Sequence, residues 1–131
     1  MRASRVSLIA QSLLYMAAGV NHFWHEGFYR RIMPDHYAHP DGWVLLTGAA
    51  EILGGIGLLH PKTRRAAAIG ITLMLIGYFD VHIFMLSHRG RFPEVPRWAL
   101  DARIPMQFLL IAWALQFARS QKRLPGRDSL Q

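Results

Sequence analysis

Four apolar stretches follow one another along this chain, and each carries strongly polar residues within it or at one end. The stretches are residues 6–20, 43–59, 66–86 and 104–118. Their polar residues are, in order, Asn21 and His22, Glu51, Asp80 and His82, and Arg103 and Gln107. If all four stretches cross a bilayer, their directions alternate and these residues fall in the same half of the membrane. An ionisable group at such a depth is costly unless it is paired or hydrated, so the pattern indicates a functional site.

The lengths of these stretches predict the fold class. A spanning helix needs about 17–25 mostly apolar residues, and each stretch reaches that length once its polar end is included. The alternative is a soluble bundle, whose helices show a charged face at 3.6-residue spacing, and none of the stretches has such a face. We therefore expect an all-α protein, a single transmembrane four-helix domain over residues 1–131. Its helices are predicted at about 4–23, 41–59 and 63–87, with a fourth that begins near Pro96.

A short interfacial helix is expected between the first two long ones. The connection 24–42 is too long for a tight turn, and we expect residues 26–33 to lie on the outer membrane surface. The side chains of this helix that should face inward are Phe28, Tyr29, Ile32 and Met33. Pro105 removes a backbone hydrogen bond within the fourth stretch. The fourth helix therefore either bends beside Arg103, which we favour, or begins near Ile104.

The basic residues predict the topology. Both termini and the 60–65 loop hold nine Lys or Arg residues against one Asp, whereas the opposite side holds six Arg against five acidic residues. Lys and Arg near span ends mark the cytoplasmic side, so both termini should be cytoplasmic and the protein multi-pass. The basic tail, Arg119 to Arg127, then suits anionic lipid head groups rather than nucleic acid. The N-terminal run resembles a signal peptide, but it continues into Asn21 and His22, so we expect no cleavage.

Glu51 is the sharpest candidate for the site because it lies near the middle of its span. A carboxylate there either carries a proton or has a cationic partner. Arg103 is the expected partner through a bidentate pair, and Gln107 lies one turn further on the same face. The first helix carries a polar stripe at helical spacing that should face the interior: Gln11, Tyr15, His22 and His25, with Asn21 beside it. The structural alternative is an ion pair and a histidine–carbonyl bond that only hold the helices together.

Asp80 and His82 cannot both face one centre, because residues two apart on a helix point about 200° away from each other. We expect His82 to face inward with Tyr78, and Asp80 to pack against another helix or another subunit. The transmembrane histidines and Glu51 also raise the question of a metal. His22, Glu51 and His82, with Asp80 or His25, offer N and O ligands that suit Zn, Fe or Mn. A second group with such ligands lies on the outer loop: Asp35, His36, His39 and Asp41.

The chain has no cysteine. Any redox chemistry must therefore come from a cofactor, a metal held by N and O ligands, or a partner.

Several short motifs, taken in order, resemble the DoxX family of small bacterial membrane proteins. They are Asn21-His22-Phe23, Ile32-Met33-Pro34, the segment from Ala50 to Gly55, the segment from Pro61 to Arg65, and the segment from Arg103 to Gln107. The resemblance implies a four-helix protein of the bacterial cytoplasmic (inner) membrane, linked to sulfur or quinone redox work and to membrane oxidoreductase complexes. The chain departs from the family pattern at Phe79-Asp80-Val81-His82, where members usually show Pro and Asn.

Three functions follow as hypotheses, and whether the chain is an enzyme is left open. The first is a redox-associated component that binds a quinone-like or other small apolar molecule, with or without a metal ion, beside an oxidoreductase partner subunit. The polar head of the bound molecule would contact Glu51, Arg103, His22 and Gln107, and the ring of that molecule would contact Tyr15, Tyr78 and Phe84. The alternative is a non-catalytic subunit or assembly factor of a membrane complex. The third is a small transporter or channel subunit with Glu51 and Asp80 as a proton path, which requires a homo-oligomer.

Overall fold

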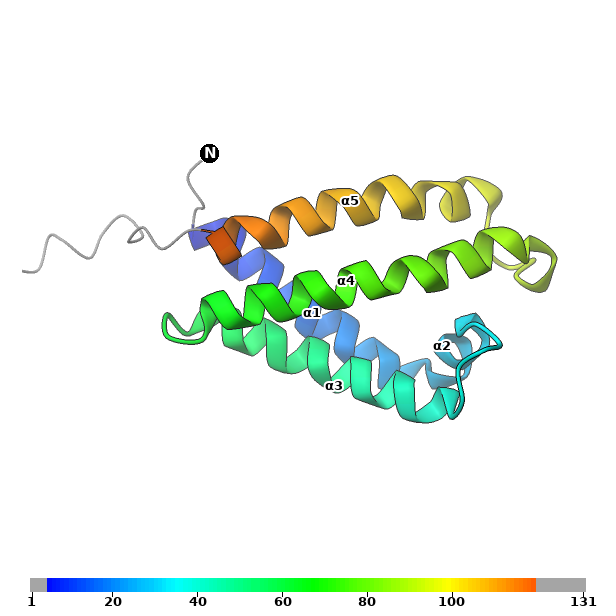
Figure 1. Ribbon diagram of the computed structural model, residues 1–131, viewed down its shortest axis with the longest axis horizontal. Coiled ribbons are helices and arrows are strands. Elements are labelled where there is room, and N and C mark those ends of the chain that lie inside the picture. The colour runs from blue at the N-terminus through cyan, green and yellow to red at the C-terminus, as the bar shows by residue number, and fades with distance from the viewer. Residues whose placement is uncertain (1–4, 120–131) are drawn as a thin grey trace, which may run out of the picture.

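The computed structural model describes residues 5–119, and within them the chain is helical and has no strand. The helices are α1 (Arg5–Trp24), α2 (Glu26–Ile32), α3 (Pro40–Leu59), α4 (Arg64–Ser87) and α5 (Arg97–Arg119), with a 3-10 turn at Arg89–Arg91 (Figure 1). The all-α class and the short helix between the first two long ones are thus confirmed. The N-terminal Arg2 and the basic tail beyond Arg119 lie outside the described residues.

The four long helices form two pairs. α1 packs mainly against α3, and α4 packs mainly against α5, while a smaller contact between α3 and α4 joins the pairs. The pairs approach each other at the turn between α3 and α4 and spread apart toward α2 (Figure 1). α2 contacts α1, α3 and α4 at this wide end. α3 and α4 pack against each other in antiparallel directions, and their connection is the short turn at residues 60–63.

Glycines allow α1 and α3 to approach closely. A Cβ atom added to Gly55 would lie 2.7 Å from the carbonyl oxygen of Ser12, and one added to Gly48 would lie 2.8 Å from Cβ of His22. Such distances are shorter than side chains tolerate, so the two helices touch backbone to backbone. This close approach is typical of helix pairs with small residues at their interface.

Proline marks the helix ends and also one helix interior. Pro40 occupies the first turn of α3, where its missing N–H costs nothing, and α3 ends at Leu59, shortly before Pro61. α5 runs without interruption through Pro105. The fourth long helix therefore begins well before Ile104, as favoured from the sequence, and Arg103 lies inside it.

Two apolar cores stabilise the assembly. One, near the narrow end, includes Leu58, Ile71 and Phe117; the other, near α2, includes Ile32, Phe84, Met85, Phe92 and Leu100. Large apolar side chains are also exposed on the outer faces of the long helices, such as Leu109 on α5, which is 72% exposed. Within residues 5–119, two helices are long and apolar enough to cross a membrane, α3 and α4.

Candidate functional site

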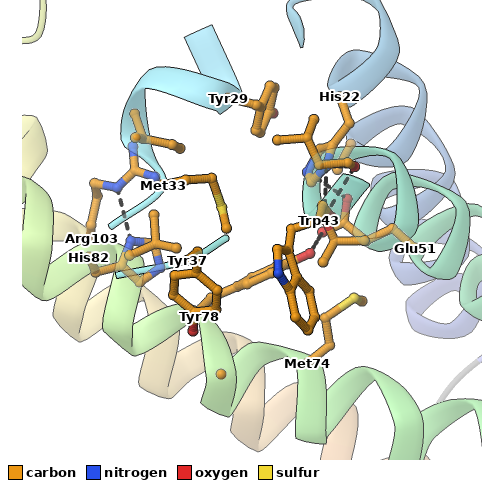
Figure 2. Close-up of a pocket in the computed structure, with 16 residues that line it drawn as sticks. His22, Tyr29, Met33, Tyr37, Trp43, Glu51, Met74, Tyr78, His82 and Arg103 are labelled. Carbon is orange, nitrogen blue, oxygen red and sulfur yellow. Dashed lines mark hydrogen bonds and ion pairs between the residues drawn. The ribbon is translucent and has the colours of Figure 1, made fainter. Parts of the chain in front are cut away.

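A pocket of about 370 Å³ lies at the wide end of the molecule, between the two helix pairs. This volume is typical of small-molecule sites. Its walls are mostly apolar and aromatic, with Ile32, Met33, Tyr37, Trp43, Val44, Met74 and Val81 among them. Two polar groups lie on opposite walls (Figure 2): His22 and Glu51 on the α1–α3 side, and His82 and Arg103 on the α4–α5 side. The pocket therefore has the apolar walls and few convergent polar groups of a ligand site.

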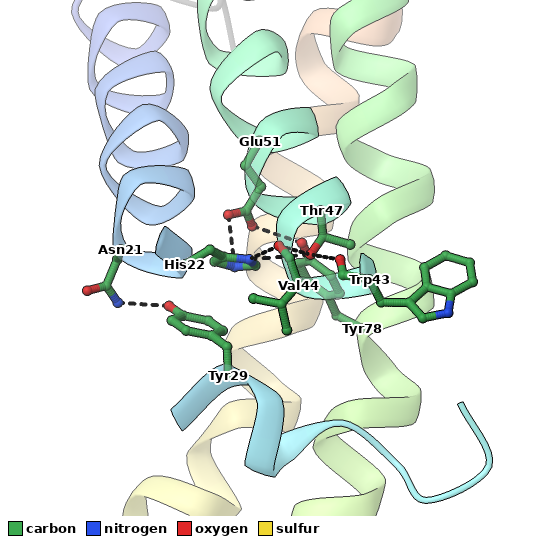
Figure 3. Close-up of polar contacts among 8 residues, drawn as sticks. All are labelled: Asn21, His22, Tyr29, Trp43, Val44, Thr47, Glu51 and Tyr78. Atoms are coloured by element: carbon green, nitrogen blue, oxygen red, sulfur yellow. Dashed lines mark hydrogen bonds and ion pairs between the residues drawn. The ribbon is translucent and has the colours of Figure 1, made fainter. Parts of the chain in front are cut away.

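The acidic wall is built around Glu51, which is 4% exposed. The Tyr78 hydroxyl donates to Glu51 Oε1 at 3.1 Å, and His22 Nε2 lies 3.2 Å from Glu51 Oε2 (Figure 3). The contact to His22 is close but lacks the alignment of a hydrogen bond, since Oε2 has no hydrogen-bond partner in the described part of the chain. Glu51 Oε2 therefore keeps the capacity to bond a further group, which buried oxygens rarely leave unused.

The tautomer of His22 follows from its other contact. His22 Nδ1 lies 3.2 Å from the carbonyl oxygen of Val44, and because a carbonyl only accepts, Nδ1 carries hydrogen. In the neutral ring Nε2 is then an acceptor facing Glu51. Nε2 of His22 and Oε2 of Glu51 lie close together but are not hydrogen-bonded to each other, and either atom can carry a proton. A buried acid with such a neighbour is suited to giving a proton to a ligand or taking one from it.

Residues around the acidic wall fix its geometry. The Thr47 hydroxyl donates to the Trp43 carbonyl at 2.8 Å. Asn21 does not line the pocket but donates to the Tyr29 hydroxyl oxygen at 2.8 Å, which leaves the Tyr29 O–H as a donor at the pocket wall. Burial is the main reason that the pKa of Tyr29 is raised above 10.0, so this phenol stays protonated.

The basic wall is a chain of hydrogen bonds in which each residue donates to the next. Arg103 Nε donates to His82 Nδ1 at 3.0 Å, and an arginine can only donate. His82 therefore carries its hydrogen on Nε2, which donates to Gln107 Oε1 at 3.1 Å. Gln107 Nε2 completes the chain by donating to the Leu75 carbonyl at 2.5 Å. In this arrangement His82 is neutral, and Gln107 acts from behind the wall rather than within the pocket.

Arg103 has donors to spare. Its bond to His82 uses Nε, and within residues 5–119 no carboxylate lies within ion-pair distance of its guanidinium. The side chain nonetheless lines the pocket. A positive charge without a counter-charge in a largely apolar cavity favours a ligand oxygen that is negative or strongly polarised.

The structure overturns the expected pairing of Arg103 with Glu51. The two residues come from helices of different pairs, which spread apart at this end, so they face each other across the pocket while Glu51 takes His22 and Tyr78 as neighbours. Within the described residues Asp80 pairs with a loop rather than with another helix, and the expected contact with another subunit stays a prediction. The Asp80 carboxylate lies 2.9 Å from His36 Nε2 in the loop before α3, and a hydrogen bond with it raises the pKa of Tyr37 above 10.0.

Other expectations for individual residues are met in part. His82 faces inward with Tyr78 as expected, and Tyr15 is buried in the apolar core rather than at the pocket. Phe84 packs in the core near α2 and does not line the pocket. His25 is exposed, because α1 ends at Trp24, and its ring bonds Asn21 Oδ1 at 2.5 Å. The inward stripe of α1 thus ends at His22.

The candidate metal ligands do not form a cluster. His22 and Glu51 are neighbours, but His82 lies on the opposite wall, and residues 5–119 hold no group of three or more ligating side chains. Three of the candidate residues on the outer loop are engaged in ion pairs instead. Asp35 pairs with Arg91, His36 with Asp80, and Asp41 with Arg30.

Several pocket residues were not predicted as site residues from the sequence: Tyr29, Met33, Tyr37, Trp43 and Met74. The aromatic residues of this set, Tyr29, Tyr37 and Trp43, are conspicuous in the sequence, but aromatic rings at span ends also settle at membrane interfaces. Tyr29, Met33 and Tyr37 reach the pocket because residues 25–39 fold back over the wide end of the bundle, whereas Trp43 and Met74 reach it from α3 and α4. The sequence pattern does not specify how these segments meet.

Buried polar groups extend from the pocket into the interior of α1. The Gln11 side-chain amide and the Tyr15 hydroxyl are buried and lack hydrogen-bond partners of good geometry within the described residues. Both belong to the predicted inward stripe of α1, and Gln11 is fully buried. The stripe is therefore polar along its length, and it faces the core rather than the outer surface.

Comparisons with known proteins give one match. A family model described as a domain of unknown function (DUF8561) matches residues 11–118. No curated protein and no solved structure matches the chain. The matched residues include the whole pocket, from Ala18 on α1 to Arg103 on α5. The chain therefore belongs to the DUF8561 family.

Proposed function

We propose that this DUF8561 protein is a multi-pass protein of the bacterial cytoplasmic membrane whose pocket binds a quinone-like or other small, largely apolar molecule. The membrane assignment is supported by the two candidate spans, α3 and α4, and by exposed apolar side chains on α1 and α5 such as Leu13 and Phe108. If all four long helices cross the bilayer, the excess of Lys and Arg at both termini and in the 60–65 loop supports a cytoplasmic location for both termini. The pocket then lies in the outer half of the membrane.

The observation that carries the ligand proposal is that two polar groups on opposite walls of the pocket have unused hydrogen-bonding capacity. Glu51 Oε2 is buried without a hydrogen-bond partner, and the guanidinium of Arg103 keeps free donors across the pocket. A molecule with two polar oxygens separated by an apolar ring would satisfy both walls at once. Quinones have this shape, with carbonyl oxygens at opposite ends of one ring.

The residues divide the work in this proposal. Arg103 would bond one ligand oxygen and stabilise negative charge on it. The pair of Glu51 and His22 would exchange a proton with the other oxygen. Electrons would come from a partner oxidoreductase subunit, so this chain would supply the binding site and the proton. The resemblance to the DoxX family supports the same assignment, and we propose that the two families are related in function.

Binding measured on purified protein tests the proposal. A benzoquinone should bind wild-type protein, and Glu51→Gln and Arg103→Gln should each weaken it by about tenfold, which is the loss of roughly 1.4 kcal/mol expected for one charge-assisted hydrogen bond. Leu73→Ala is the matched control, because Leu73 is 64% exposed on α4 and lies outside the pocket. Equal affinity in wild type and both pocket variants would remove the proposal.

A second candidate, a non-catalytic subunit or assembly factor, is favoured by the internal pairing of the pocket's polar groups. Tyr78 already bonds Glu51, and His82 already bonds both Arg103 and Gln107. Such networks also serve to hold helices together. In that case Glu51→Gln should lower the melting temperature of the protein, and no quinone should bind. A variant that melts like wild type and loses binding contradicts this second candidate.

A further inference from the structure

A second hollow adjoins the pocket. It is an apolar groove of about 730 Å³ along α3 and α4, with Leu53, Ile56, Ala67 and Gly70 in its walls. Thr47 and Met74 line both the groove and the pocket. The two hollows therefore share a wall segment, and Met74 lies at the boundary as an unbranched, flexible side chain. The groove runs from this boundary to the α3–α4 turn, where His60 and Thr63 line it.

The groove has a closed floor and an open side. A Cβ atom added to Gly54 would lie 2.9 Å from Ile71 Cγ1, and one added to Gly57 would lie 2.9 Å from Ala67 Cβ, so the helices touch along the bottom. A Cβ added to Gly70 meets nothing within 4 Å. The groove is thus a furrow on the outside of the bundle, formed by the two helices that qualify as membrane spans.

We infer that the ligand is an amphiphile with one long apolar tail, whose head occupies the pocket while its tail lies in this groove. The inference rests on the proposed function and specifies its ligand class. A tail leaving the pocket past Thr47 and Met74 would stay against apolar side chains for the remaining length of α3. It would also leave the polar head between Glu51 and Arg103, at the end of the groove that adjoins the pocket.

Two ligands and one matched pair of variants test this inference. The probes are a dimethoxy-methyl-benzoquinone without a tail and the same ring with a decyl tail. Gly70→Phe should fill the groove, whereas Leu73→Phe adds a similar ring elsewhere on α4, where Leu73 is already 64% exposed. Gly70→Phe should weaken the tailed quinone by about fivefold or more and leave the tailless quinone unchanged, and Leu73→Phe should affect neither.

The outcomes separate this inference from the proposed function. If neither quinone binds wild-type protein, the proposed function fails and the inference fails with it. If the tailless quinone binds but Gly70→Phe leaves the tailed quinone unaffected, the pocket stands and the groove is not its continuation.

A photoreactive group at the tail end gives an independent measurement. A diazirine there should label peptides that contain the groove residues near the α3–α4 turn, such as Ala67 and Gly70. Labelling confined to α1 or α5 would show that the tail leaves the pocket by another route and would overturn the inference. Labelling near the turn that is lost in Gly70→Phe supports it.

Discussion

The close contact between α1 and α3 makes Gly55→Ala a sharp test of the fold. A methyl group at this position would lie 2.7 Å from the Ser12 carbonyl oxygen and 2.8 Å from Met16 Cγ, whereas ordinary contacts begin at 3.4 Å. The Ser12 oxygen is backbone, so it cannot rotate away as a side chain would. The helices would have to separate by about 0.7 Å at this point, the difference between the ordinary and the built distance, and this would loosen the pair that carries His22 and Glu51.

The magnitude follows from a comparison with Gly70→Ala on α4. Replacing a helical glycine by alanine gains about 1 kcal/mol of helix propensity at either position, so this gain cancels between the two variants. What remains is overpacking at Gly55, which costs about 1–3 kcal/mol, against no contact within 4 Å at Gly70. For a chain of this size, 1 kcal/mol corresponds to roughly 3–5 °C in melting temperature. Gly55→Ala should therefore melt about 3 to 15 °C below Gly70→Ala.

Thermal unfolding in detergent, followed by tryptophan fluorescence, measures this difference. The four tryptophans are present in both variants, so the signal is the same. Equal melting temperatures would show that α1 and α3 do not touch backbone to backbone, and the placement of His22 against Glu51 would lose its support. A drop in both variants would instead indicate that α4 packs against a surface that the structure leaves open.

Two further predictions concern the topology and the basic wall. The chain has no cysteine, so Gly90→Cys and Lys62→Cys each introduce a single thiol. A membrane-impermeant maleimide should label Gly90→Cys in intact spheroplasts, and it should label Lys62→Cys only after lysis. The reverse labelling pattern would show that the protein has the opposite orientation in the membrane. His82 should carry its hydrogen on Nε2, because its Nδ1 accepts a hydrogen bond from Arg103. The ¹⁵N chemical shifts of the imidazole report which nitrogen carries the hydrogen. A ring with its hydrogen on Nδ1 would contradict the chain of hydrogen bonds from Arg103 to Gln107.

The sequence by itself determined the helices. Apolar stretches of spanning length, closed by His60-Pro61 and by Arg89-Gly90, predict long helices whatever their neighbours, because local periodicity and proline chemistry act within a few residues. It also determined that Glu51 and His22 are interior, since a polar residue in an apolar stretch is tolerated when it is turned away from the apolar surroundings.

Only the tertiary structure decided which polar residues meet. The membrane depth expected from their positions in the sequence predicted Arg103 as the partner of Glu51. That depth does not specify which helices are neighbours. Glycines bring α1 against α3, so the carboxylate of Glu51 takes His22 as its neighbour. Because the two helix pairs are separated at this end, Arg103 hydrogen-bonds His82 instead, and the pocket lies between the two helix pairs. Pairing of side chains depends on contacts between segments distant in sequence, and those are fixed by packing rather than by local pattern.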